Sequence, residues 1–588
     1  MSLAYREISI MMSLFRNNNG LESYWDYTAS SAGRAGTGYI NNYTGNLVWV
    51  WSDIGFGGNR MPVSISHIYN TNDSMNNDFG MGYGWRTNFN QLVYDKTNYL
   101  NTLAYGNGDS VQYTYDQLGR VTQESYYEDN STTVSDTVKY QYDNDGALAA
   151  VIDSETGITS KYYYDFIDRL CKYTESGENY SLIMEYGFDK MNNMTTIVET
   201  INGNRRSSSI TYDLDNRVTS LRKGSVTEAY TYDDYSRVSD KTTTISDETR
   251  LTEHITYRAP STGITTGQIA SLTIDAANHD VTYSYTYDKN GNILSVSDGT
   301  HTTTYTYDSA NQLTRENNQA EDKTWTWTYD NAGNILSRSE YGYTTGDLSS
   351  LTPMTVSYAY TDADWGDLLT SYNGQTIQYD EIGNPLTDGT WTYTWQHGRE
   401  LASMTDGSTT WNYTYNADGL RTKRTNGSLT YQYYYADGQL VRIAVGNKYL
   451  DISYDASGTP MSLYYSGYQV GDAKGNYYYV TNVQGDVVAI VNDAGEAVVT
   501  YTYDAWGNIL EVGGSMASTL GVYNPLRYRG YVYDNETGLY YVSSRYYDPE
   551  IGRFINADSQ LNQKDSILGF NMFAYCHNNP IMYSDPTI

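Results

Sequence analysis

Near the end of the chain, the run RYYDPEIGRFINAD (residues 545–558) holds the charged residues best suited to acid-base chemistry: Arg545, Asp548, Arg553 and Asp558. Two carboxylates that fold within a few ångströms of each other cannot both ionise easily, so one keeps a proton and the other can activate water. Aspartic proteases hydrolyse peptide bonds in this way. The alternative is that both aspartates only begin or cap turns and pair with the arginines.

Other catalytic chemistry has little support in the sequence. The six histidines are scattered singly, with no H-E-x-x-H motif and no zinc-type spacing to Cys171 or Cys576. We therefore expect no metal site and no cofactor. His577 beside Cys576 could serve a thiol nucleophile, but a pair that packs in the core is the favoured interpretation.

The amino-acid composition argues against some classes of partner and against a disordered chain. Of 588 residues, 37 are basic and 69 acidic, which gives a net charge of -32 and argues against a nucleic-acid partner. Mean hydropathy is -0.61, yet 66 tyrosines and 11 tryptophans supply surface to bury, so the chain is not of the disordered class. We expect no membrane-spanning segment, and the patch Ile8–Phe15 lacks the cleavage site of a signal peptide.

The elements that must position these residues come from a repeat of about twenty residues. Tyr-Asp pairs recur at gaps of 20 to 22, as at Tyr287, Tyr307 and Tyr329. In YSYTYDKNGNIL, from Tyr283, aromatic residues alternate with Ser or Thr at the period of a strand, and Asp and Gly then favour a tight turn. Each repeat is thus predicted to be one β-hairpin. Successive hairpins can pair into a continuous sheet, which predicts an all-β fold.

The aromatic ladder has two interpretations. It could be a surface on which a ligand stacks, or cross-strand packing that holds a long sheet together. Packing is favoured because the aromatic residues recur in every repeat whatever its position. A related alternative for the whole chain is a cell-wall or carbohydrate-binding repeat protein. Such repeats typically carry a Gly-Trp step, whereas the tryptophans here are irregular, with Trp325, Trp327, Trp391, Trp395 and Trp411 clustered.

The unit Y-x-Y-D-x-x-G-x-L/V resembles the YD repeat of the RHS (rearrangement hotspot) family, bacterial polymorphic toxins among its members. The N-terminal stretch TGYINNYTGNLVWVW, from Thr37, is similar to the lead-in segment of large bacterial RHS proteins. The stretches 524–558 and 570–587 resemble the RHS-repeat-associated core motif. The resemblance implies a β-sheet strip that spirals into a hollow shell, with the core folded inside.

This resemblance also suggests how the chain divides. We expect a poorly ordered N-terminal arm at residues 1–20 and a lead-in β segment at 21–100. The YD-repeat shell would then occupy 101–520 and the core 521–588. In bacterial members a toxin follows the core, so the expected partners are a C-terminal toxin polypeptide, absent from this chain, and an immunity protein that binds it.

Activity and placement follow from the same resemblance. It makes Asp548 and Asp558 the acid-base pair of a self-cleavage reaction near the end of the core, oriented by Arg545 or Arg553. Bacterial relatives are commonly exported, so we expect a secreted or cell-surface location. Ile588 stands where the family usually has a glycine before the toxin.

Overall fold

The computed structural model describes residues 99–259, 266–277, 279–468, 472–558 and 567–585, and the backbone of the strands between 27 and 94. The arm predicted at 1–20, which includes the patch Ile8–Phe15, lies outside the described residues. The described part is all-β except for short helical turns, so the predicted fold class is confirmed. The only α-helix found there is α1 (Leu520–Tyr523). Within this part of the chain, no helix is long and apolar enough to cross a membrane.

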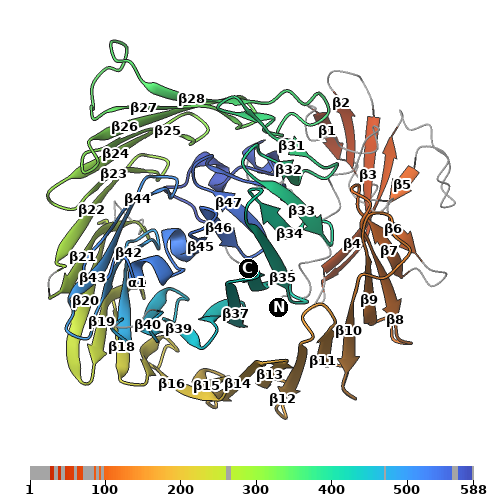
Figure 1. The fold of residues 1–588 in the computed structure, drawn as a ribbon, viewed down its shortest axis with the longest axis horizontal. Coiled ribbons are helices and arrows are strands. Elements are labelled where there is room, and N and C mark those ends of the chain that lie inside the picture. Colours follow the sequence, from red (N-terminus) through yellow and green to blue (C-terminus); the bar gives the residue numbers. More distant parts are fainter. Residues whose placement is uncertain are drawn as a thin grey trace.

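Antiparallel sheets make up the molecule, and most strands pair with their neighbours in sequence (Figure 1). The largest sheet closes on itself, and a 14-stranded sheet continues the chain. A 5-stranded N-terminal sheet and a 4-stranded C-terminal sheet complete the fold. The N-terminal sheet runs from β1 (Tyr27–Ser31) to β5 (Trp85–Thr87), and the largest sheet from β6 (Leu92–Tyr94) to β30 (Gln375–Thr376). The 14-stranded sheet runs from β31 (Gln378–Tyr379) to β44 (Ile509–Gly513), and the C-terminal sheet from β45 (Val532–Asp534) to β48 (Arg553–Phe554).

One YD repeat is one hairpin, as predicted. In β22 (Val281–Tyr287) the tyrosines are buried or half-buried, whereas Ser284 and Thr286 are exposed. Oδ1 of Asp288 accepts hydrogen bonds from the N–H groups of Asn290 and Asn292, both at 2.8 Å. Gly291 has φ +93°, a conformation that glycine adopts without strain, and β23 (Ile293–Ser297) then returns.

In most Tyr-Asp pairs of the wall, the tyrosine hydroxyl bonds back to the preceding hairpin. The Tyr287 hydroxyl donates to the carbonyl oxygen of Ile269 at 2.8 Å, and the Tyr307 hydroxyl donates to that of Ile293 at 2.7 Å. The same contact recurs at Tyr115, Tyr142, Tyr164, Tyr212, Tyr232, Tyr329, Tyr454 and Tyr503, and also at Tyr257, which is followed by Arg258. These contacts give the ladder the packing role that the sequence favoured.

The second sheet runs alongside the first in the same direction. The N–H of Gly398 donates to Asp109, and the N–H of Ala505 donates to Glu316. Between these two contacts, Asp437 accepts from the Tyr186 hydroxyl. Partners are 289, 189 and 251 residues apart, and later residues contact later residues. The strip is therefore a spiral. In its second turn, the loops that close the YD hairpins pack against the first turn of the spiral.

The C-terminal core lies inside the curved wall (Figure 1). Its strands are β45, β46 (Leu539–Val542), β47 (Arg545–Asp548) and β48, with 3-10 turns at Tyr528–Gly530, Ile567–Phe570 and Cys576–Asn578. Asn578 and Asn579 donate side-chain hydrogen bonds to Gln312 and Asn292 in the YD turns of the wall. In the wall strand β36 (Arg421–Thr425), the fully buried Arg421 pairs with Asp534 of the core.

Candidate functional site

Adjacent core strands position three of the four residues singled out from the sequence. Arg545 begins β47 and Asp548 ends it, and Asp548 lies opposite Arg553 of β48 in the strand register. Asp558 follows β48, and its backbone N–H donates to the carbonyl oxygen of Met572 at 2.8 Å. This backbone pairing brings the end of the core, residues 567–585, beside β48.

Arg545 is the centre of an acidic cluster. Its Nη1 lies 2.9 Å from Oδ2 of Asp558, and its Nη2 lies 2.6 Å from Oδ2 of Asp585. The guanidinium also stacks over the Phe554 ring, 3.5 Å from the ring centroid. All three charged side chains are largely shielded from water, with exposed fractions of 12%, 29% and 24%. Asp558 therefore shares its arginine with Asp585.

Asp585 is held from both its side chain and its backbone. Its N–H donates to the Tyr531 hydroxyl at 2.8 Å, and this hydroxyl donates in turn to the Asp585 carbonyl oxygen at 2.9 Å. Burial raises the pKa of Asp585; Arg545 lowers it, and the Asp558 carboxylate raises it. The Asp558 carboxylate thus adds to burial in favouring the protonated form of Asp585.

Asp548 has a different environment. Its Oδ1 accepts hydrogen bonds from the N–H groups of Glu550 and Ile551, at 2.8 and 3.2 Å. Burial, and then the Glu550 carboxylate, raise the pKa of Asp548 to about 7. The carboxyl group thus both begins a turn before Pro549 and is poised to change charge near neutral pH.

Arg553 connects the core to the wall. Its Nη1 donates to Asn334 at 2.9 Å and to the Tyr360 hydroxyl at 2.6 Å, and its Nη2 donates to the carbonyl oxygen of Asp367 at 2.8 Å. The side chain is 3% exposed. These contacts position β48 against the wall, so the orienting role considered for Arg553 stays a prediction.

Sequence reasoning missed Asp585 and Tyr531. One signal could have indicated Asp585: it precedes Pro586, as Asp548 precedes Pro549. Tyr531 had no such signal among 66 tyrosines. Burial raises the pKa of Cys576 to about 12, which opposes a reactive thiolate and agrees with the packing interpretation of the Cys576–His577 pair.

Of the five clustered tryptophans, three offer little surface for a carbohydrate, and Trp391 and Trp395 are half-buried. Trp325, Trp327 and Trp411 are 6%, 4% and 2% exposed. A sugar-stacking platform requires an accessible ring face, which these three side chains do not present.

Comparison with known proteins identifies the repeat architecture. A family model described as "Teneurin YD-shell" matches residues 208–581, more than half of the chain. The tRNA nuclease WapA of Bacillus subtilis (strain 168) is 31% identical over 236 residues, which cover 37% of this chain and 9% of that protein. Double-stranded DNA deaminase toxin A of Burkholderia cenocepacia (strain H111) is 34% identical over 111 residues, 19% of this chain and 7% of that protein. The matches thus span under a tenth of these relatives.

Solved structures share the fold. The crystal structure of TcdB2-TccC3 without its hypervariable C-terminal region has a TM-score of 0.51 at 13% identity, covering 94% of this chain and 38% of that chain. The TcdB2-TccC3-Cdc42 structure has a TM-score of 0.50 at 13% identity, covering 92% and 39%. At this level of identity the likeness concerns the fold alone.

Proposed function

Since the chain belongs to the Teneurin YD-shell family, whose relatives here include toxin proteins, we propose that it is the shell of a polymorphic toxin. In this proposal the spiral encloses a hollow interior and holds a C-terminal toxin polypeptide there. An immunity protein that binds the toxin is the further partner. The whole assembly is secreted or exposed at the cell surface.

One observation carries the proposal: the core is encircled by the wall, and Asp585 is anchored within that core. A polypeptide that continues after this point starts on the inner side of the wall. Enclosure would keep it away from proteases and from the cell that makes it. The chain's own negative charge helps to keep such a carrier in solution.

We also propose that the core cuts the chain after the shell. Asp558 and Asp585 would form the acid-base pair, one protonated and one ionised, with Arg545 holding both. The ionised carboxylate would take a proton from water as the water attacks the peptide carbonyl, and the protonated one would donate its proton to the carbonyl oxygen. When the resulting diol collapses, the C–N bond breaks, the first carboxyl group gives its proton to the leaving amine nitrogen, and the second carboxylate takes a proton back from a diol hydroxyl. The pair first inferred from the sequence, Asp548 with Asp558, is the rival assignment.

A single fusion protein tests both parts. An unstructured peptide is joined after Thr587 through a restored glycine, and the same peptide, added free in solution to the unfused chain, is the control. Limited proteolysis should spare the joined peptide in the folded protein and digest the free one. Equal digestion of the two peptides would contradict enclosure.

Intact mass measurement of the C-terminal fusion reports self-cleavage. We expect Asp558→Asn and Asp585→Asn to leave the fusion uncut, whereas Asp548→Asn still yields the two fragments. Cleavage that persists in both of the first variants would exclude the proposed pair. Loss of cleavage in Asp548→Asn with retention in Asp585→Asn would favour the rival assignment.

A further inference from the structure

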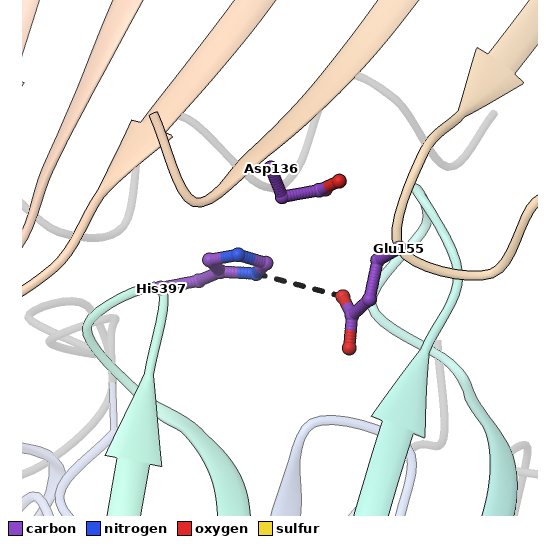
Figure 2. A group of neighbouring side chains, drawn as sticks. All are labelled: Asp136, Glu155 and His397. Atoms are coloured by element: carbon purple, nitrogen blue, oxygen red, sulfur yellow. Dashed lines mark ion pairs between the residues drawn. The ribbon is translucent and has the colours of Figure 1, made fainter. Parts of the chain in front are cut away.

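A second cluster of ionisable side chains lies where the two turns of the spiral meet (Figure 2). Asp136 begins β10 (Asp136–Tyr142), and Glu155 lies between β11 (Leu148–Asp153) and β12 (Thr159–Tyr164). His397 comes from the second turn, between β33 (Thr392–Gln396) and β34 (Glu400–Thr405). One side-chain oxygen or nitrogen from each residue lies within 4.8 Å of the others.

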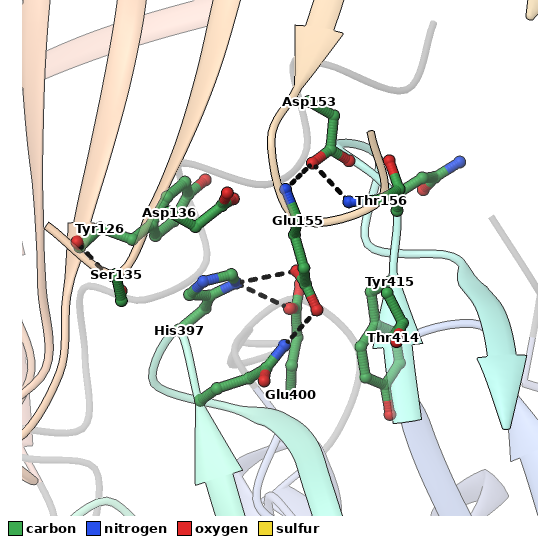
Figure 3. A network of polar contacts seen from close by, with 12 residues as sticks. Tyr126, Ser135, Asp136, Asp153, Glu155, Thr156, His397, Glu400, Thr414 and Tyr415 are labelled. Carbon is green, nitrogen blue, oxygen red and sulfur yellow. Dashed lines mark hydrogen bonds and ion pairs between the residues drawn. The ribbon is translucent and has the colours of Figure 1, made fainter. Parts of the chain in front are cut away.

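The histidine is held in place from several sides (Figure 3). Its Nδ1 lies 2.9 Å from Oε2 of Glu400 and 4.0 Å from Oε2 of Glu155. Its ring packs against Tyr126, with centroids 4.1 Å apart, and the side chain is 5% exposed. Glu155 is fixed in turn, because Gln396 Nε2 donates to its Oε1 at 2.8 Å.

Asp136 supplies a carboxylate oxygen, Oδ2, that accepts no hydrogen bond within the described residues. The residue is 7% exposed, and its Oδ1 accepts from the Ser154 hydroxyl. No residue in the described part of the chain donates a hydrogen bond to its Oδ2 or forms an ion pair with it. A carboxylate oxygen in a residue with so little exposure has few waters around it, and a cation can bind to it without displacing a protein donor.

The surrounding charge is predominantly negative. Asp153 is 5% exposed and lies near Asp136 and Glu155, and Glu400 contacts His397. Among the described residues, no lysine or arginine forms an ion pair with Asp136, Asp153 or Glu155.

We propose that Asp136, Glu155 and His397 bind one divalent transition-metal cation, with Zn²⁺ as the model ion, and that the cation joins the second turn of the spiral to the first. One imidazole nitrogen among carboxylate oxygens suits zinc better than magnesium, which prefers oxygen ligands and retains its waters. The sequence predicted no metal site because its histidines are scattered. The ligands come from positions 136, 155 and 397, so no short sequence motif contains all three.

Isothermal titration of the full chain with ZnCl₂, after dialysis against a chelator and then buffer, tests the proposal. We expect one Zn²⁺ per chain and no measurable heat with MgCl₂. His397→Gln and Asp136→Asn should each weaken binding by more than about tenfold, because even outer-shell changes at metal sites cost 10- to 100-fold. His254→Gln is the matched control, since its Nδ1 also pairs with a carboxylate, Asp240, at 2.6 Å but on an exposed face.

A second readout covers the risk that a variant folds poorly. Zn²⁺ should raise the melting temperature of the parent and of His254→Gln, and leave that of His397→Gln unchanged. Far-ultraviolet circular dichroism compares the folds, and Glu155→Gln, which keeps the side-chain volume, provides an independent loss of a ligand. Absence of stoichiometric zinc in the parent, or parent-like affinity in folded His397→Gln and Glu155→Gln, would overturn the site. Protons would then be what neutralises the carboxylates.

Discussion

Arg545 contacts two acidic side chains that are 27 residues apart in sequence, Asp558 and Asp585. The sequence singled out Arg545 and Asp558 together, because they lie close to each other in one charged run. It could not identify Asp585 as the second carboxylate, since only the folding of residues 567–585 beside β48 brings that residue in. Residue type is thus readable from a motif, whereas pairing depends on which backbone segments meet.

Asp548 gives a residue-scale prediction about pH. Its pKa in the folded chain, about 7, lies above the ordinary value of 3.8, so the folded state holds the proton more tightly than the unfolded state does. This contribution to stability is complete below about pH 4 and is lost as pH rises towards 7. We expect Asp548→Asn, which cannot ionise, to gain about 1–2 kcal/mol relative to the parent between pH 4.5 and 7.5. Urea unfolding at both pH values measures it.

Asp362→Asn is the control for that measurement. Asp362 also accepts from two backbone N–H groups, those of Asp364 and Trp365, but its side chain is exposed. The stability difference between Asp362→Asn and the parent should not change in this way with pH. A flat difference for Asp548→Asn as well would mean that Asp548 ionises normally in the folded chain.

At the scale of the hairpin, the Tyr-Asp pair has two separate tasks. The aspartate closes its own turn, as Asp288 does, while the tyrosine hydroxyl bonds to the hairpin before it, as Tyr307 does at Ile293. Alternation and turn residues were enough to predict the strands and the turn. The target of the hydroxyl was not predictable, because any residue type can supply a backbone carbonyl.

Removing one such hydroxyl should loosen one junction between hairpins. Tyr307→Phe leaves the Ile293 carbonyl without its side-chain donor, which costs about 1 kcal/mol. Amide hydrogen exchange in β23 and β24 (Thr302–Tyr307) should then be roughly fivefold faster, as read by mass spectrometry. Tyr163→Phe is the control, since that ring is 44% exposed and its hydroxyl has no hydrogen bond within the described residues. Equal changes in hydrogen exchange in the two variants would contradict the proposal that the Tyr307 hydroxyl stabilises the junction between hairpins.

At the scale of the whole molecule, the spiral determines whether the side chains of a YD hairpin turn are buried or exposed. The second residue after the aspartate is Leu118 in one YD turn and Trp506 in another. Leu118, on the first turn, is 76% exposed, whereas Trp506, on the second, is 2% exposed and packs against Trp327. The repeat could be predicted from sequence, but this difference could not, because contacts between turns join residues about 190 to 290 apart that share no motif.

Paired truncations test this description of the wall. Trp506→Ala should lower the free energy of unfolding by about 3–5 kcal/mol, because it leaves a cavity between the two turns. Leu118→Ala, at the equivalent position of a free edge, should change it by less than about 0.5 kcal/mol. Thermal or urea unfolding of both variants measures the contrast. Similar losses in the two would contradict the assignment of one edge as buried and the other as free.

The hydrogen bonds from the tyrosine hydroxyls to preceding hairpins also suggest an order in which the wall folds. Each bond joins a hairpin to the one made just before it, so a hairpin that leaves the ribosome already has its support in place. The strip can therefore be laid down in the order of its synthesis, as in other repeat proteins stabilised by contacts between neighbouring units. The core, translated after the wall, would then enter a wall that has already been built.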